Sequence, residues 1–192
     1  MTFIDAYLDE TVGAFIELKS NSQNRQVLQE MSDTIVHSLR NGGKLLICGN
    51  GGSAGDAQHI AGEFISRLMF DRDPLPSIAL TTDSSVLTAV GNDYGYEHIF
   101  KRQVMGLGAP GDVLLGISTS GNSRNVHQAF EAGRTKNLTC IGFTGASSSE
   151  MDRYCRLLLR APSAKTAIVQ QLHITAAHII CALVEKTMFN RD

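Results

Sequence analysis

The chain has 192 residues, of which 43% are hydrophobic, so it is long enough for a buried core and we expect a single domain. Its 17 basic and 19 acidic residues give a formal net charge of -2, and the scattered lysines and arginines argue against nucleic-acid or anionic-membrane binding. The first ten residues include acidic side chains and no unbroken apolar stretch, so we expect no signal peptide, no membrane anchor and a cytoplasmic location.

Short apolar runs alternate with helix-length segments along the chain. Two helices are predicted ahead of the first strand, at 4–19 and 25–40. Strands are predicted at 44–48, 77–80, 113–117, 139–143 and 156–159. The helices between them are predicted at 54–67, 84–90, 99–105 and 123–132, the last ending before Gly133 as a helix stop. This alternation indicates a parallel α/β sheet flanked by helices.

A long helix, predicted at 166–188, closes the chain and is apolar over more than one stripe. Ile168, Leu172 and Leu183 lie on one face, and small or apolar neighbours widen the surface, so we expect this helix to pack against another subunit.

The cysteines are far apart and form no C-x-x-C motif, so all four are expected to be reduced and structural: Cys48, Cys140, Cys155 and Cys181.

A glycine-rich turn follows the first predicted strand, in Cys-Gly-Asn-Gly-Gly-Ser53. A strand that passes through such a turn into a helix leaves backbone N–H groups free, and these groups bind phosphate or another anion with the help of the helix dipole. Ser53 either adds a hydroxyl to that site or caps the helix. The spacing Gly49-x-Gly51-x-x-Ala54, with Asp83 after the second strand, also fits a dinucleotide fingerprint, so a nicotinamide enzyme is an alternative.

A second turn, rich in hydroxyl groups, follows the third predicted strand. It contains Ser118, Thr119, Ser120 and Ser123. Helix capping explains one of these residues but not all of them, whereas capture of a phosphate explains the cluster. A dinucleotide enzyme needs no second loop of this kind, so the two turns together favour a sugar-phosphate or similar ligand over a nicotinamide cofactor.

Polar side chains on two helices are candidates for chemistry. His59 and Glu63 are four residues apart and share one helix face, where they either bind a metal, share proton transfer, or form an ordinary hydrogen bond on a solvated face. On the last helix, His173 and His178 are each interpreted, taken singly, as a hydrogen-bonded core histidine. The remaining histidines are interpreted as surface or helix-end residues: His37, His98 and His127.

Taken together, five segments resemble the phosphoheptose isomerase family of SIS (sugar isomerase) proteins, from about residue 42 to the end of the last helix. The segments are Cys-Gly-Asn-Gly-Gly-Ser53, Asp-Ala-Gln-His-Ile-Ala-Gly-Glu63, Gly-Asn-Asp93-Tyr-Gly-Tyr, Gly-Asp-Val-Leu-Leu-Gly-Ile-Ser-Thr-Ser-Gly-Asn-Ser123, and Gln170-Gln-Leu-His173 followed by His178. The resemblance implies one SIS domain of three-layer, flavodoxin-like αβα architecture with a five-stranded parallel sheet. Residues 1–41 would be helices used in packing or oligomerisation, and 42–192 the sheet core and last helix.

The resemblance also assigns roles to individual residues. Glu63 and His178 match the acid–base pair. The positions that match zinc ligands are His59, Glu63, Gln170 and His178, which implies one zinc ion per subunit. The positions that match substrate contacts are Asn50, Gly51, Gly52, Ser53, Glu63, Asn92, Asp93, Ser118, Thr119, Ser120, Ser123 and Gln170.

The implied reaction is isomerisation of sedoheptulose 7-phosphate to D-glycero-D-manno-heptose 7-phosphate through an enediolate, the first step of heptose synthesis for lipopolysaccharide or capsule. It requires a proton to move between adjacent carbons and an enediolate oxygen to be stabilised. A non-catalytic SIS module, such as the replication-initiator-associating protein, is the alternative, as is an isomerase of another sugar phosphate. Such modules have lost the residues present here as Glu63 and His178, so the sequence favours an enzyme.

Two further expectations concern the last helix. Where the family commonly has a basic residue and an acid, this chain has Ile168 and Gln171, so substrate choice is less well defined than reaction type. Gln170 and His178 are eight residues apart, about 12 Å of helix rise. Either long side chains converge from two turns or ligands come from different subunits, and we expect a homotetramer with a shared site and no nucleic-acid or membrane partner.

Overall fold

The computed structural model describes residues 1–190 and confirms the predicted α/β sandwich. Its five-stranded sheet is parallel, with the strand order β2-β1-β3-β4-β5, which is the flavodoxin-like order. The strands are β1 (Leu45–Gly49), β2 (Ser77–Ala79), β3 (Val113–Ile117), β4 (Thr139–Thr144) and β5 (Leu157–Arg160). All five were predicted within a residue or two. The central strands β1, β3 and β4 are buried on both faces, which gives short continuous apolar runs.

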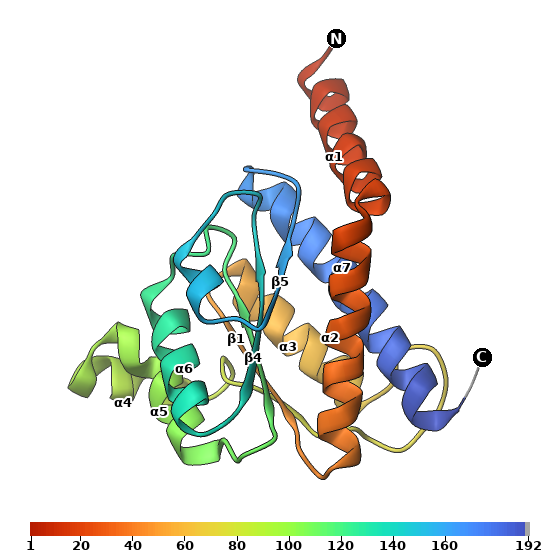
Figure 1. Ribbon diagram of the computed structural model, residues 1–192. Coiled ribbons are helices and arrows are strands. Elements are labelled where there is room, and N and C mark those ends of the chain that lie inside the picture. Colours follow the sequence, from red (N-terminus) through yellow and green to blue (C-terminus); the bar gives the residue numbers. More distant parts are fainter. Residues whose placement is uncertain (191–192) are drawn as a thin grey trace.

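Helices cover both faces of the sheet and complete the three layers (Figure 1). They are α1 (Phe3–Ser20), α2 (Ser22–Arg40), α3 (Gly52–Ile65), α4 (Ser84–Tyr94), α5 (Ile99–Leu107), α6 (Arg124–Thr135) and α7 (Thr166–Phe189), with short 3₁₀ helices η1 (Tyr96–His98) and η2 (Glu150–Arg153). Alternate strand residues point to opposite faces: Leu45 and Ile47 join the core under α2, α3 and α7, whereas Leu46 and Cys48 join the core under α5 and α6. The four cysteines are free thiols, as expected.

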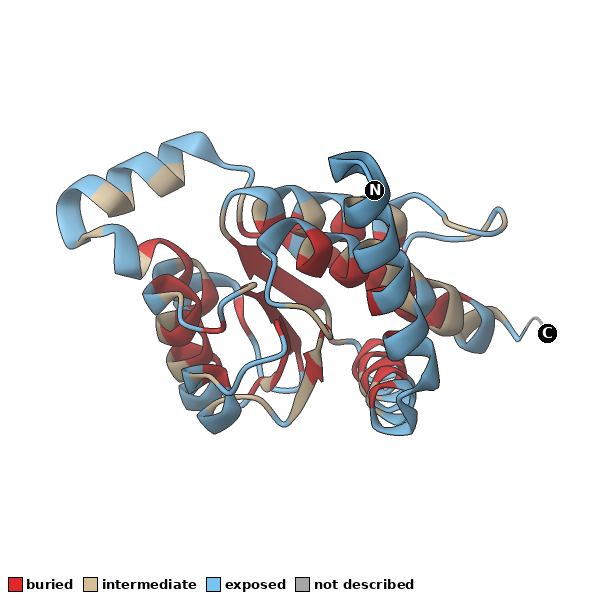
Figure 2. Cartoon of the chain, turned by 90° about the horizontal axis from the view of Figure 1, so that it is seen from above, coloured by how far each residue is buried: buried red, intermediate tan, exposed pale blue. Residues whose placement is uncertain are grey.

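The apolar helix α7 is a core helix. It is long and apolar enough to cross a membrane by length and composition, but half of its most apolar window is buried inside this one chain. It packs against α2 and α3 and contacts α1, which buries part of its wide apolar surface within the single chain. Exposed apolar side chains also gather on α1, which extends beyond the sheet layers (Figure 1) and is mostly exposed (Figure 2).

Two helix ends differ from the prediction. Gly133 does not stop α6, which continues to Thr135, and the chain turns at Asn137 in the left-handed conformation. A Cβ at Gly133 would lie 3.1 Å from the Cys140 sulfur and 3.1 Å from Leu114, so this glycine allows the helix to approach the sheet closely. The helix α4 extends past the predicted end at residue 90 to Tyr94. It has no fully buried residue, so its sequence lacks the regular apolar spacing from which a helix end can be predicted.

A buried ion pair fixes the end of α7 to the loop after α3. The Glu185 carboxylate accepts hydrogen bonds from the backbone N–H groups of Leu68 and Met69, at 3.0 and 2.7 Å, and from Arg72 Nε at 2.9 Å. Arg72 in turn donates to the carbonyl of Glu63 at 2.7 Å. Both charged side chains are almost fully buried. Burial raises the pKa of Glu185, but these hydrogen bonds and the guanidinium outweigh it and leave the pKa below its usual value.

Replacing Glu185 by glutamine should destabilise the fold by about 3–5 kcal/mol, because Arg72 would remain buried without its counter-ion. Urea unfolding measures this difference. Since the pKa of Glu185 is lowered in the folded state, its contribution is complete above the ordinary pKa of a glutamate and is lost as the pH falls, so the difference should shrink below about pH 4. The exposed pair Glu150–Arg153 is the control, and Glu150→Gln should change stability by less than about 1 kcal/mol. Equal losses in the two variants would contradict this account.

Candidate active site

The two polar turns meet at one edge of the sheet. Strands β1 and β3 are neighbours in parallel register, with Gly49 opposite Ile117, so the turns that follow them lie side by side. The chain continues from β1 to one side of the sheet and from β3 to the other, which makes this edge the topological switch point where α/β proteins bind ligands.

The first turn is built for close approach of the backbone. Gly51 has a φ of 56°, in the left-handed region, and precedes α3 without any side-chain cap. A Cβ at Gly49 would lie 2.7 Å from the Ser53 carbonyl oxygen and 3.0 Å from that of Ile117, so only glycine fits between β3 and α3. Ser53 is buried and does not cap the helix. The start of α3 therefore has no side-chain cap, and the N–H groups of Ser53 and Ala54 donate to the backbone carbonyls of Asn50 and Gly51, both at 3.0 Å. The positive end of the helix dipole at this turn still favours an anion.

Asn50 is held by a reciprocal pair of amides. Its Nδ2 donates to Asn125 Oδ1 at 2.9 Å, and Asn125 Nδ2 donates back to Asn50 Oδ1 at 2.7 Å. The Tyr96 hydroxyl also donates to Asn50 Oδ1, at 3.0 Å. Asn125 is buried at the start of α6, so this network joins the first turn to the helix that follows the second. Asn125 and Tyr96 were not predicted, because their roles depend on this contact between distant segments.

The hydroxyl groups of the second turn bond to each other rather than capping α6. Ser118 and Ser123 Oγ atoms are 2.8 Å apart, Ser118 and Ser120 Oγ atoms are 3.5 Å apart, and the N-cap residue Ser123 makes no capping hydrogen bond. Thr119 lies between Ser118 and Ser120 and is partly exposed. No serine of this turn caps α6, so the capping interpretation is wrong. The hydroxyl groups can instead bind a ligand.

Three potential metal ligands converge beside these turns. His59 Nε2 lies 3.1 Å from Glu63 Oε1 and 3.1 Å from His178 Nε2, and the ligand atoms of the three residues all lie within 4.8 Å of one another. One proton on His59 cannot satisfy both contacts, whereas a cation would be bound by all three lone pairs, and imidazole and carboxylate are ligands that zinc accepts. Nearby on α3, burial raises the pKa of Asp56, although His59 opposes the shift.

Sequence predictions for the histidines were partly wrong. His173 is a core histidine: its Nε2 lies 3.1 Å from the Thr144 carbonyl oxygen, and burial lowers its pKa to about 4. His178 is not a core histidine, because it is partly exposed beside His59. His127 lies near the start of α6, as a helix-end residue does, but it is not a surface residue, because it is buried and bonds to the second turn. The convergence of His59, Glu63 and His178 within one chain also means that these three need no second subunit.

The remaining residues that the sequence singled out lie in different places. Gln170 lies against the first turn, because a Cβ at Gly52 would lie 2.8 Å from the Gln170 Cδ. Asn92 and Asp93 are exposed at the end of α4 and hydrogen-bond to each other, and within the described chain α4 packs mainly against η1 and α5. Asp83, the ribose-binding candidate of the dinucleotide alternative, instead caps α4 by accepting from the N–H of Val86 at 3.0 Å.

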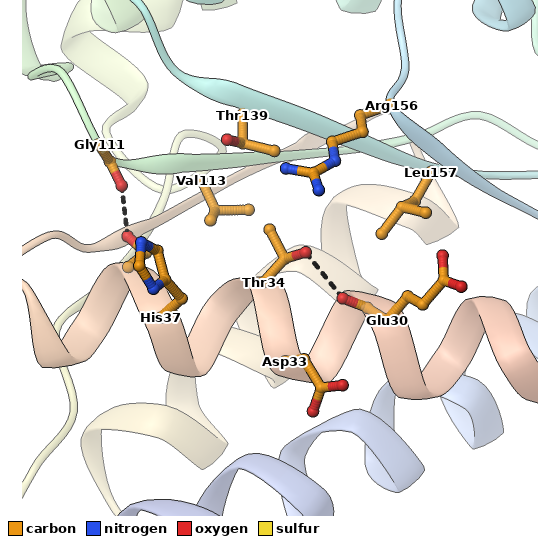
Figure 3. A pocket seen from close by; sticks show the side chains of 10 residues that line it. Glu30, Asp33, Thr34, His37, Gly111, Val113, Thr139, Arg156 and Leu157 are labelled. Atoms are coloured by element: carbon orange, nitrogen blue, oxygen red, sulfur yellow. Dashed lines mark hydrogen bonds between the residues drawn. The ribbon is translucent and has the colours of Figure 1, made fainter.

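A separate cavity of about 600 Å³ lies at the opposite ends of the strands (Figure 3). Glu30, Asp33 and His37 line it from α2, and Arg156 lines it from the start of β5. It contains none of the predicted site residues. The two polar turns lie at the opposite, carboxyl edge of the sheet, so residues that line this cavity are distant positions for control variants.

Comparison with known proteins agrees with this geometry. Residues 7–145 match the SIS domain family model, so the fold and site define a sugar isomerase-type domain. The phosphoheptose isomerase of Burkholderia pseudomallei (strain 1710b) is 49% identical over 192 residues, covering 100% of this chain and 98% of that protein. This chain belongs to the phosphoheptose isomerase family.

Two solved structures of the same family superpose closely. The phosphoheptose isomerase of Francisella tularensis has a TM-score of 0.91 and 36% identity, over 97% of this chain and 100% of the other. That of Neisseria gonorrhoeae has a TM-score of 0.88 and 39% identity, over 95% of this chain and 97% of the other. The agreement covers the sheet and the flanking helices, so the resemblance seen in the motifs extends to the complete fold.

The contact between Gly52 and Gln170 is testable with a matched pair of glycines. Gly52→Ala should displace the flexible Gln170 side chain, lowering sugar-phosphate affinity by about tenfold while changing stability by less than about 1 kcal/mol. Gly55→Ala, three residues along the same helix, meets open space, so it should leave the affinity unchanged and raise stability by at most about 1 kcal/mol through helix propensity. Calorimetric titration and thermal unfolding measure the two quantities. The same loss of affinity in both variants would show that the contact with Gln170 is irrelevant.

Proposed function

We propose that this protein isomerises sedoheptulose 7-phosphate to D-glycero-D-manno-heptose 7-phosphate through an enediolate. The observation that carries the proposal is the position of Glu63 and His178 beside two anion-binding turns, in a chain that matches phosphoheptose isomerases over its full length. A phosphate held at the turns places the sugar carbons near a carboxylate and an imidazole, the groups that move protons in aldose–ketose isomerisation.

Different residues are proposed to bind the phosphate, to orient the sugar and to move the proton. The hydroxyl groups of Ser118, Thr119, Ser120 and Ser123 and the backbone of the first turn bind the phosphate, and Asn50 and Gln170 orient the sugar. Asn92 and Asp93 are proposed as further substrate contacts. Glu63 and His178 exchange the proton between adjacent carbons. Glu63 Oε1 faces His59, which leaves its second carboxylate oxygen for the substrate.

Zinc is the proposed cofactor, held by His59, Glu63, Gln170 and His178. When bound, it would act as a Lewis acid that stabilises the enediolate oxygen. The clustering of His59, Glu63 and His178 supports this assignment, since two imidazoles and a carboxylate are a donor set that fits zinc.

A non-catalytic sugar-phosphate-binding module is the competing function. It needs the two turns but not a carboxylate and an imidazole at the substrate, so the presence of Glu63 and His178 in one cluster favours catalysis.

We propose a cytoplasmic enzyme that supplies heptose for lipopolysaccharide or capsule.

A homotetramer is proposed on the evidence of α1. Its exposed apolar residues recur about every four positions and so form one stripe, consisting of Phe3, Ile4, Leu8, Val12 and Ile16. An exposed stripe of this kind on a helix that extends from the body fits association with other copies of the chain.

Glu63→Gln should abolish turnover of sedoheptulose 7-phosphate, because the amide keeps the size of the side chain but cannot accept the proton. Turnover is measured by product formation with and without added zinc, and metal binding by equilibrium dialysis. The wild-type protein should lose activity after chelation and regain it with zinc, while Glu63→Gln stays inactive in both. Glu30→Gln, in the distant cavity of Figure 3, is the control and should retain activity. A folded wild-type protein that binds the sugar phosphate but never turns it over would favour the binding module.

Leu8→Glu should dissociate the proposed tetramer, since it places charges in the apolar stripe. Light scattering should show a smaller species, with little loss of monomer stability because Leu8 is exposed in the single chain. The exposed Asp9→Ser variant on the same helix should keep the wild-type mass. If the site is shared between subunits, activity should fall on dilution together with assembly. A monomer with full activity would refute a shared site.

A further inference from the structure

His127 makes a contact that the proposed reaction does not explain. It is buried on α6, and its Nε2 lies 3.0 Å from the carbonyl oxygen of Gly121, in the middle of the second turn. A carbonyl can only accept a hydrogen bond, so Nε2 carries the hydrogen and donates it. The imidazole therefore holds the backbone of the turn from its inner side.

This hydrogen bond fixes the orientation of one peptide group. In a trans peptide the carbonyl and the following N–H point in opposite directions, so a Gly121 carbonyl directed inward to His127 turns the Asn122 N–H away from the core. That N–H donates a hydrogen bond to Ser120 Oγ at 3.2 Å, so the same peptide orientation also holds the serine hydroxyl at the surface, where both Ser120 and Asn122 are exposed. An outward N–H beside serine hydroxyl groups is the arrangement that attracts an anion.

The turn needs an external restraint at this position. Gly121 has a φ of 67° and can rotate its peptide at little cost, since it has no side chain. A larger residue could not restrict it, because a Cβ at Gly121 would lie 2.6 Å from Thr144 Oγ1 and would also collide with Ser149. A rotated peptide would direct the carbonyl oxygen outward, where it would repel a phosphate.

The imidazole is itself held in place. Its ring stacks on Tyr154 with centroids 5.4 Å apart and an angle of 23° between the planes, and Tyr154 stacks in turn on Phe130 at 6.2 Å. The Tyr154 hydroxyl donates to Glu131 at 3.3 Å, on the same helix as His127. This aromatic stack limits the rotation of the imidazole, so the donor remains directed at Gly121.

We propose that His127 is a positioning residue that holds the Gly121–Asn122 peptide in its phosphate-binding orientation. The inference rests on the proposed function insofar as the second turn binds the phosphate of the substrate. His127 itself would touch neither the phosphate nor the reacting carbons, and its effect would be confined to the affinity of the turn for the anion.

Two variants of similar polarity test this role. Glutamine places its amide nitrogen at about the reach of Nε2, whereas the shorter asparagine matches only Nδ1. His127→Asn should weaken inorganic phosphate and sedoheptulose 7-phosphate about tenfold in calorimetry, equivalent to about 1.4 kcal/mol, and should raise KM while changing kcat less than about twofold. His127→Gln should stay within about threefold of wild type in each constant.

Phe100→Leu is the control for loosened packing, because Phe100 is buried in the same core cluster as Phe130 but takes no part in the stack that holds His127. It should lower thermal stability but leave phosphate affinity near wild type. Equal phosphate affinity in wild type and His127→Asn, or equal weakening in Phe100→Leu and His127→Asn, would overturn the inference. Failure of the wild-type protein to bind phosphate would instead count against the proposed function.

Discussion

The parallel pairing of β1 with β3 is the constraint on which the site depends. Neither turn is a complete site alone: the first offers backbone N–H groups and the second offers hydroxyl groups, and only the register of the two strands places them at one edge. Glycine at position 49 keeps that edge compact, because a side chain there would separate α3 from β3. Packing in the interior of the sheet thus determines the spacing of polar groups at its surface.

The second constraint acts on α3 and α7, which carry His59, Glu63 and His178. These helices pack against each other, and the Arg72–Glu185 pair connects the end of α7 to the carbonyl of Glu63. A buried ion pair is a poor source of net stability compared with apolar packing. Its value here is geometric, because a directed pair with several hydrogen bonds resists sliding of one helix along the other, and a slide would separate the Glu63 carboxylate from His178.

The fold was predictable from sequence to a greater extent than the site. Strands produce short apolar runs whatever their partners, so all five were recognisable, whereas α4, which is only partly buried along its length, left little periodic signal beyond residue 90. His59 and Glu63 are neighbours on one helix turn, but His178 is 119 positions from His59 and only the family motifs connected them. The roles of Asn125 and His127 escaped prediction because each partner lies in a turn whose path is set by tertiary packing.

The site also differs from the rest of the described interior in how well its polar groups are paired. Polar atoms in the described interior generally find partners, yet Asp56 Oδ2 and Thr144 Oγ1 are buried without one, and two imidazole nitrogens and a carboxylate face each other beside α3. Each such group weakens the fold of the isolated chain, so its retention requires a compensating interaction. A cation would bind the lone pairs near His59, and an anion would accept hydrogen bonds from the hydroxyl groups of the second turn, which bond to one another in the single chain. Groups that suit a cation and groups that suit an anion thus lie on neighbouring elements, which is the pattern that a sugar phosphate needs if it is bound by its phosphate at one end and by its reacting oxygens at the other.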